Sequence, residues 1–221
     1  MKTKGLFSGI LAAMALTSFA GAFTAFAADG DVEINKTNFP DYNFREFVSE
    51  KCDTDRNGVL SQGEIDAVRG INVNRAKIAD LKGIEFFYAL TELYCWGNQL
   101  TSLDVSHNTA LTRLECYNNQ LTSLDVSKNT ELTGLSCLGN QLTSLDVSKN
   151  TALTGLKCSD NQLTSLDVSQ NTALTYLGCW DNQLTSLDVS KNTALTELEC
   201  DSNKLTSLDV SGCTVLTELL C

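Results

Sequence analysis

A unit of 21 residues recurs along most of the chain and constrains its fold more than any other feature of the sequence. Six complete copies fill residues 90–215, a degenerate copy covers residues 71–89, and a seventh begins at Leu216 and stops at Cys221. A short unit of this kind cannot bury its own apolar face, so its copies must stack on one another. Seven cysteines mark the period, since each lies 21 residues from the next: Cys95, Cys116, Cys137, Cys158, Cys179, Cys200 and Cys221.

Each unit consists of two half-repeats with the pattern Leu-x-x-Leu-x-(Cys or Val)-x-x-Asn. In residues 114–116 and 124–126, apolar and polar residues alternate, which is typical of a half-buried strand. We therefore expect a solenoid of short parallel strands in a right-handed stack, with copies about 4.8 Å apart and two narrow sheets. The asparagine that ends each half-repeat, such as Asn119 or Asn129, is expected to bond backbone groups that the turns leave unpaired.

The sequence LxxLxCxxNxL resembles the leucine-rich repeat pattern, with cysteine at the third apolar position. Residues 78–90, IADLKGIEFFYAL, are similar to the repeats that open internalin-like bacterial proteins, and the nested 21-residue form resembles secreted bacterial leucine-rich repeat proteins. The resemblance covers residues 71–221. It implies a surface for contact with other proteins, usually without catalysis, and it identifies no partner.

The first 27 residues predict export. Lys2 and Lys4 precede an apolar stretch over residues 6–20, and Ala25-Phe26-Ala27 forms a small-x-small cleavage pattern. These are the parts of a secretory signal peptide, so we expect cleavage near Ala27 and a secreted or cell-surface protein. The alternative is a membrane anchor, but the apolar run is short and no cluster of charges follows it. No later segment approaches the ~20 apolar residues of a spanning helix, so we expect no transmembrane segment in the mature chain.

Residues 53–64, DTDRNGVLSQGE, match a twelve-residue EF-hand loop. Gly58 permits the sharp turn at the sixth position, and Leu60 fits the eighth position, which usually points into a core. Apolar residues on either side suit short helices, so residues 28–68 are predicted to form a helix-loop-helix cap ahead of a solenoid over residues 69–221. Six residues are predicted to ligate Ca²⁺ through side-chain oxygens or, for valine, the backbone carbonyl: Asp53, Asp55, Asn57, Val59, Ser61 and Glu64.

The alternative is an acidic surface turn, because Asp, Asn and Gly are also common turn residues. A single loop resembles half of an EF-hand pair, or one of the two loops of a dockerin. With three carboxylates, we expect binding on the order of 10⁻⁴ to 10⁻³ M. The predicted role of Ca²⁺ is structural: it orders the cap over the first apolar coil.

The two half-repeats differ in how much they vary between copies. The second half-repeat barely changes, and its aspartate column, which begins at Asp104, reads as either a cation ladder or a solvated face balanced by lysines. The first half-repeat varies around its cysteine, where outward aromatic residues are typical anchors for a protein or glycan. Drift at unpacked positions would give the same pattern. The predicted contact residues are Tyr94, Trp96, Tyr117, Leu138, Tyr176 and Trp180.

The cysteine column invites three interpretations: a metal site, disulfides or core packing. Metal sites prefer cysteine pairs within one loop, and no such pair occurs. In-register side chains in adjacent coils point poorly toward one another for disulfides. We therefore expect buried free thiols that act as small apolar residues, with Cys52 as the more exposed one.

Charge and composition exclude several classes. With 16 basic against 27 acidic residues and a net charge of −11, the chain cannot easily supply a phosphate-binding patch, so no nucleic-acid partner is expected. The single histidine, His107, stands where three of the other five copies carry lysine, which argues against an enzyme. The sequence predicts a binding or adaptor module. The alternative is a spacer or dockerin-like tether that displays another domain. The chain stops within a coil, which predicts either a longer natural product or self-association through the uncapped C-terminal coil.

Overall fold

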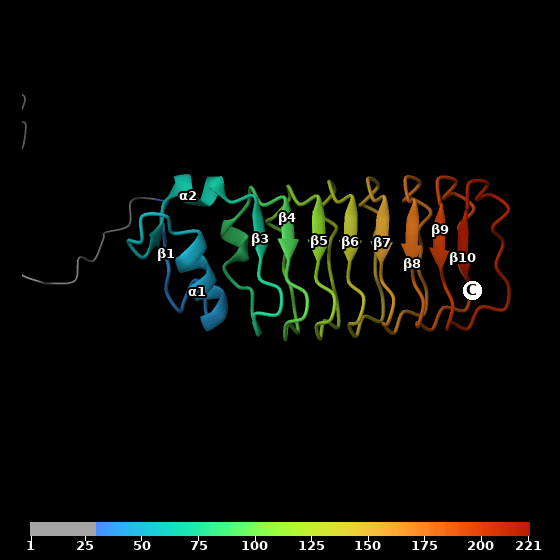
Figure 1. The fold of residues 1–221 in the computed structure, drawn as a ribbon, viewed down its shortest axis with the longest axis horizontal. Helices are drawn as coiled ribbons and strands as arrows, with labels where there is room; N and C mark the ends of the chain where they lie inside the picture. The colour runs from blue at the N-terminus through green and yellow to red at the C-terminus, as the bar shows by residue number, and fades with distance from the viewer. Residues whose placement is uncertain (1–29) are drawn as a thin grey trace, which may run out of the picture.

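A computed structural model of the protein describes residues 30–221, and a small helical cap leads there into a long solenoid (Figure 1). The predicted signal peptide, residues 1–27, lies outside the described residues. The cap contains strand β1 (Val32–Glu33), helix α1 (Tyr42–Lys51), strand β2 (Val59–Leu60) and helix α2 (Gln62–Ala67). None of the helices in residues 30–221 is long and apolar enough to cross a membrane.

Side-chain caps define where the two cap helices begin. Asp41 accepts a 3.0 Å hydrogen bond from the Phe44 N–H at the start of α1. Ser61 and Glu64 form a reciprocal capping box at the start of α2, which satisfies N–H groups that a helix leaves unpaired. As the sequence predicts, the apolar residues of both helices turn inward, with Phe44, Val48 and Ile65 buried.

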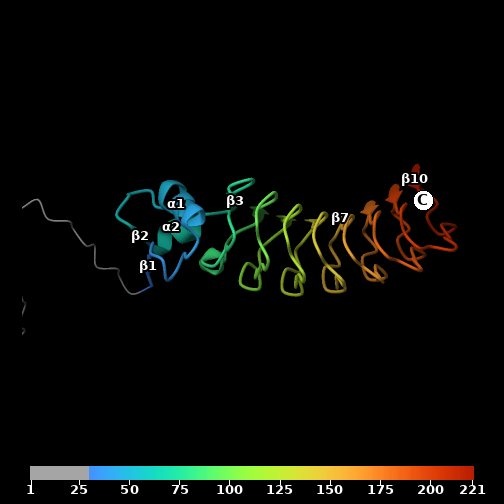
Figure 2. The ribbon, with the colours of Figure 1, turned by 90° about the horizontal axis from the view of Figure 1, so that it is seen from below.

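The solenoid is built on one parallel sheet of eight strands, which follow one another in chain order. It starts with β3 (Gly70–Asn72), and a 3-10 helix η1 (Ile84–Phe86) lies in the first coil. Seen from below, the strands lie along one edge of the coils and the second half-repeats loop along the other (Figure 2). The remaining strands are β4 (Glu92–Tyr94), β5 (Arg113–Glu115), β6 (Gly134–Ser136), β7 (Gly155–Lys157), β8 (Tyr176–Gly178), β9 (Glu197–Glu199) and β10 (Glu218–Leu220).

The register places each residue opposite its equivalent in the next coil, so Leu93 pairs with Leu114 and Leu114 with Leu135. Leucines at these central positions from β4 to β9 are buried, and so are the cysteines that follow the same strands. This confirms the predicted leucine-rich repeat solenoid and the predicted burial for six of the seven column cysteines, whereas for Cys221 the prediction is wrong. In the last coil, Leu219 and Cys221 are exposed.

The prediction of a second narrow sheet is wrong. Within residues 30–221, the second half-repeats form turns joined by a single isolated bridge, between Asp104 and Asp125. Asp104 Oδ1 accepts a 2.9 Å hydrogen bond from the Ser106 N–H, and the Asn108 N–H bonds the Val105 carbonyl at 3.0 Å. These local bonds compete with a strand ladder for the backbone N–H groups, and they recur in the following coils.

The cap is joined to the first coil through Phe39, whose ring is fully buried. The ring lies 5.9 Å from the ring of Phe44 in α1 and 5.7 Å from that of Phe86 in η1. Asp41 adds a second link, since its Oδ2 accepts a 2.9 Å hydrogen bond from the Ala79 N–H. The cap therefore covers the apolar end of the solenoid at its first coil.

Candidate functional site

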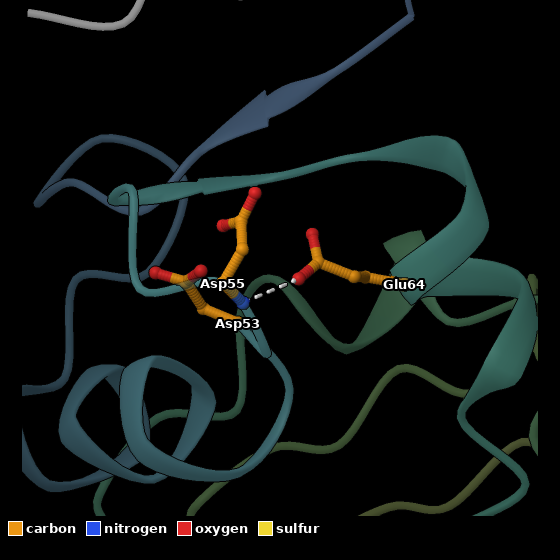
Figure 3. A group of neighbouring side chains, drawn as sticks. All are labelled: Asp53, Asp55 and Glu64. Atoms are coloured by element: carbon orange, nitrogen blue, oxygen red, sulfur yellow. Dashed lines mark hydrogen bonds between the residues drawn. The ribbon is translucent and has the colours of Figure 1, made fainter.

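The structure brings three acidic side chains together in the loop between α1 and α2 (Figure 3). Asp53 and Asp55 follow the end of α1, and Glu64 reaches back toward them from the first turn of α2. Carboxylate oxygens of all three lie within 4.8 Å of one another. Asp53 is buried, with 3 % of its surface exposed, whereas Asp55 is exposed. An all-oxygen set with three negative charges suits a hard divalent cation such as Ca²⁺.

The loop backbone is organised around Asp53. Its Oδ2 accepts a 2.9 Å hydrogen bond from the Gly58 N–H, and its Oδ1 accepts one of 3.2 Å from the Asn57 N–H. Gly58 has φ 84°, which confirms the predicted sharp turn at a position that favours glycine. Leu60 is fully buried, as expected for the eighth loop position.

Strand β2 within the loop pairs with β1, in antiparallel register between Val59 and Glu33. Asn57 Oδ1 accepts a 2.8 Å hydrogen bond from the Val59 N–H, and its amide donates one of 2.9 Å to Asp55. Ser61 Oγ donates a 2.9 Å hydrogen bond to Glu64 Oε2. The six predicted ligand residues therefore share one hydrogen-bonded loop, in which the three carboxylates converge.

Glu64 is the residue that closes the loop. Its Oε1 accepts hydrogen bonds from the backbone N–H and the hydroxyl of Thr54, at 2.6 and 2.7 Å, and its Oε2 accepts from the Ser61 N–H at 2.9 Å. Partial burial raises the pKa of this carboxyl, but the hydrogen bonds from Ser61 and Thr54 outweigh burial and lower the pKa to about 2. Thr54 is not among the predicted site residues, because its loop position carries no ligand in the EF-hand pattern.

The prediction that Cys52 is an exposed thiol is wrong. Only 4 % of its surface is exposed, because the residue ends α1 and packs into the apolar core of the cap. Burial, together with the negative charge of Glu64, raises the pKa of this thiol to about 12.

The outward surface of β3–β10 and of the residue after each cysteine, here called the strand face, carries all six predicted contact residues. Each of them is half-buried. The register makes Trp96, Tyr117 and Leu138 neighbours in successive coils. Trp180 lies two coils beyond Leu138, with Ser159 between them, so the structure brings three of the six together and places Tyr176 and Trp180 further along.

Part of this aromatic surface is already engaged within the protein. The rings of Trp96 and Tyr117 stack with centroids 5.1 Å apart and an interplanar angle of 7°. On the preceding coil, the guanidinium of Arg75 lies 4.4 Å from the centre of the Trp96 ring. Further along, Tyr176 donates a 2.8 Å hydrogen bond to Glu199, and the Lys157 ammonium lies 5.1 Å from its ring. These contacts hold the aromatic side chains in fixed positions.

Comparison with known proteins supports the solenoid. Residues 88–129 match the family described as Leucine Rich repeats (2 copies), and residues 201–217 match the family described as Leucine Rich repeat. Internalin J of Listeria monocytogenes is 45 % identical over 71 residues, which are 32 % of this chain and 8 % of that protein. The chain therefore matches only a small part of this curated relative.

Solved structures share the fold over more of the chain. The functional domain of InlJ from Listeria monocytogenes, which includes a cysteine ladder, is 33 % identical with a TM-score of 0.53, over 85 % of this chain and 56 % of that domain. Internalin C2 from the same organism is 22 % identical with a TM-score of 0.80, over 88 % and 89 %. A leucine-rich repeat protein of Leptospira interrogans is 26 % identical with a TM-score of 0.64, over 70 % and 44 %. The chain therefore has a leucine-rich repeat solenoid like those of the internalin structures.

Proposed function

We propose that the protein is a non-enzymatic binding or adaptor module, secreted or displayed at the cell surface, which contacts other proteins through its strand face. One observation carries the proposal: a rigid parallel sheet holds inward positions constant from coil to coil while its outward positions vary. Similarity to internalin structures supports a surface for protein contact. The apolar leader over residues 1–27 supports export.

The opposite side of the coils, here called the constant face, does not offer the same chemistry as the strand face. Its outward residues repeat almost unchanged as Ser, Asp and Ser, from Ser102, Asp104 and Ser106 onward. A partner would meet the same pattern in every coil and could not distinguish one position from another. The outward residues of the strand face differ from coil to coil, so a partner can recognise one position along the array.

Quantitative capture from a mixture of extracellular proteins tests this function. A triple variant of the strand face, W96A/Y117A/W180A, is compared with a triple variant of the constant face, S123A/S144A/S165A, after circular dichroism has established that both fold. We expect proteins retained by the wild type and the constant-face variant to be lost from the strand-face variant. Equal retention by all three chains would reject the strand face and favour a spacer or tether that displays another domain.

We further propose that the loop between α1 and α2 binds Ca²⁺ and that the ion stabilises the cap. Asp53, Asp55 and Glu64 would supply charged oxygens, and Asn57, Val59 and Ser61 would complete the set. Bound Ca²⁺ supplies the positive charge that balances three converging carboxylates. Because Glu64 lies in α2 and Asp53 follows α1, ligation by both residues would fix the two helices relative to each other.

Isothermal titration calorimetry at millimolar Ca²⁺ tests the second proposal. We expect heat of binding from the wild type and from D104A/D125A, which removes two carboxylates of the constant face, but none from D53A/E64A. Thermal unfolding should show the matching rise in stability only in the first two chains. Equal heats from D53A/E64A and the wild type would refute a site in this loop.

A further inference from the structure

A hollow of about 410 Å³ lies on the strand face over β5, β6 and β7. Its floor contains Gly134 and Gly155, which occupy the same outward position in neighbouring strands. Tyr117 and Leu138 line one part of it, and Arg113 borders it on the preceding strand. In this position of the sheet, the chain carries large side chains at Arg113 and Tyr176 on either side of the two glycines.

Packing within the protein does not require the two glycines. An added Cβ at Gly155 would have no neighbour within 4 Å, and one at Gly134 would meet only Cγ of Arg113 at an ordinary 3.9 Å. Gly178 in β8 differs, because its added Cβ would lie 2.8 Å from the Tyr176 hydroxyl. Glycine weakens a strand and often marks the close approach of a ligand or of another backbone. The hollow is therefore open toward solvent for an external group.

The walls of the hollow carry more positive than negative charge. Arg113 and Lys157 border it, and a single carboxylate, Glu115, accompanies them in a 3.0 Å ion pair with Arg113. Ser136 in the middle strand, the buried register neighbour of Glu115 and Lys157, adds a hydroxyl group. Arg113 is paired with Glu115 and lies beside Glu92 of β4 in the register, so Lys157 is the cation of the hollow that an incoming group would meet. The chemistry of these walls complements a carboxylate attached to an apolar or aromatic neighbour.

The far end of the strand face has the opposite charge. Glu197 and Glu199 in β9 and Glu218 in β10 gather there, and the register places Glu218 beside Glu197. Burial and the charges of Glu218 and Glu199 raise the pKa of the Glu197 carboxyl. Strand spacing puts Glu197 and Glu199 in β9 about 10–14 Å from the glycine floor, two strands beyond Gly155 and three beyond Gly134, and Glu218 in β10 lies one strand further.

We propose that the hollow receives an acidic side chain of a partner protein, while a basic side chain about 10–14 Å further along the partner meets the cluster of Glu197, Glu199 and Glu218. This inference rests on the proposed function of the strand face and adds the chemistry and orientation of the partner. The separation corresponds to about four residues of an extended peptide. Reversing the two charges would place like charges against each other, so the face accepts the partner in one direction.

Nuclear magnetic resonance titration of the full, isotope-labelled chain with synthetic peptides tests the inference. The first probe is acetyl-Asp-Phe-Thr-Thr-Lys-amide, and its controls replace Asp by Asn or Lys by Gln. We expect the first probe to shift the amide signals of Gly134 and Gly155 at millimolar concentration. Each control should bind about tenfold more weakly, as expected for the loss of a charge-assisted contact.

Two matched variants complete the test. G155L fills the hollow, whereas G70L places the same side chain at the equivalent outward position of β3, where an added Cβ also has no neighbour within 4 Å. We expect G155L to lose the signal changes and G70L to retain them. Equal binding by both variants, or no shift at Gly134 and Gly155, would overturn the acidic subsite. Strand-face capture by W96A/Y117A/W180A is measured separately, so failure of the subsite is distinguishable from failure of the proposed function.

Discussion

The side-chain amide of Asn129 donates a 2.9 Å hydrogen bond to the backbone carbonyl of Asn108, the same position one coil earlier. The same Nδ2 donates one of 3.0 Å to the Val105 carbonyl, so a single amide ties its turn to two groups of the preceding turn. These asparagines are fully buried. The arrangement repeats along the second half-repeats at Asn150, Asn171 and Asn192.

Replacing Asn150 by alanine should lower the free energy of unfolding by about 1–3 kcal/mol, because two buried hydrogen bonds of 2.9 and 2.8 Å are lost. The acceptor carbonyls of Val126 and Asn129 keep one turn bond each, which limits the cost. Urea unfolding followed by circular dichroism measures the change. S144A, on the exposed side of the same coil, should remain within about 0.5 kcal/mol of the wild type. A similar loss in both variants would contradict a special role for the asparagine.

Cys213 interrupts this ladder near the end of the array. Its Sγ lies 3.5 Å from the Val189 carbonyl and 3.7 Å from the Asn192 carbonyl, the groups that an asparagine amide would bond. C213N should therefore stabilise the last coils by about 1 kcal/mol, since an amide supplies two strong donors in place of one weak thiol. Amide hydrogen exchange in residues 190–213 measures the effect. The expected order of protection is C213N, wild type, C213A, and a C213N chain no better protected than C213A would refute the argument.

Gly83 lies in the first coil, directly against Phe39 of the cap. It has φ 104°, and an added Cβ would collide with Cδ1 of Phe39 and lie 2.8 Å from the Asn38 carbonyl oxygen. G83A should cost about 3 kcal/mol, through backbone strain and displacement of the Phe39 ring. G30A is the matched control, since Gly30 also has φ 104° but an added Cβ would have no neighbour within 4 Å. We expect about 1 kcal/mol there, so equal losses in thermal unfolding would show that only backbone strain matters.

The buried thiols predict a loss of stability in alkali. Burial raises the pKa of Cys137 to about 12, whereas a thiol in the unfolded chain has a pKa of about 8.5. Between these values the unfolded state binds fewer protons than the folded state, so stability falls as pH rises and is fully present below pH ~8.5. The Cys137 thiol contributes about 1.4 kcal/mol per pH unit in this window.

Urea midpoints from pH 7 to pH 11 measure the slope. C137A should be less stable at pH 7, because it leaves a small cavity, but its stability should fall less steeply with pH by about one proton. An unchanged slope would mean that the thiol of Cys137 ionises equally easily in both states.

The stack of Trp96 on Tyr117 should appear as a coupling energy between neighbouring coils. A double-mutant cycle with W96A, Y117A and the double variant should give about 0.5–1.5 kcal/mol of coupling, the usual value for an aromatic pair. The pair of Trp96 and Trp180 serves as the control, because these residues are four coils apart and should be additive. Equal coupling in both cycles would attribute the effect to the stability of the whole array instead of the ring contact.

The repeat period predicts the parallel sheet well, because the positions that recur as leucine or cysteine in every copy are the positions whose side chains are buried between coils. Residues 114–116 were expected to form a strand, and β5 covers Arg113–Glu115 in the register that the spacing implies. The equivalent expectation for residues 124–126 failed. The alternation of apolar and polar residues is the same there, but the side chain of Asp125 bonds the Ser127 N–H at 2.8 Å and turns the chain. Apolar periodicity does not register such local competition.

Other features depend on contacts between distant segments. The pairing of Val59 with Glu33 and the burial of Cys52 arise from how the cap packs, which loop spacing does not encode. The EF-hand pattern predicted that carboxylates of Asp53, Asp55 and Glu64 would come together, because twelve-residue spacing is itself a geometric rule. It gave no sign of the Thr54 contacts with Glu64, since a hydroxyl at that position has no place in the pattern.

Because the coils stack in register, the distance between two features of the strand face is a whole number of coil spacings. Deleting or duplicating 21 residues would preserve the leucine contacts between coils and change only the number of coils between two residues of the strand face. Removing the coil that contains β8, for example, would bring the cluster around Glu197 one strand spacing, about 4.8 Å, closer to Gly155. Recombination between near-identical repeats would thus adjust the distance between recognition points in fixed steps without a new side chain.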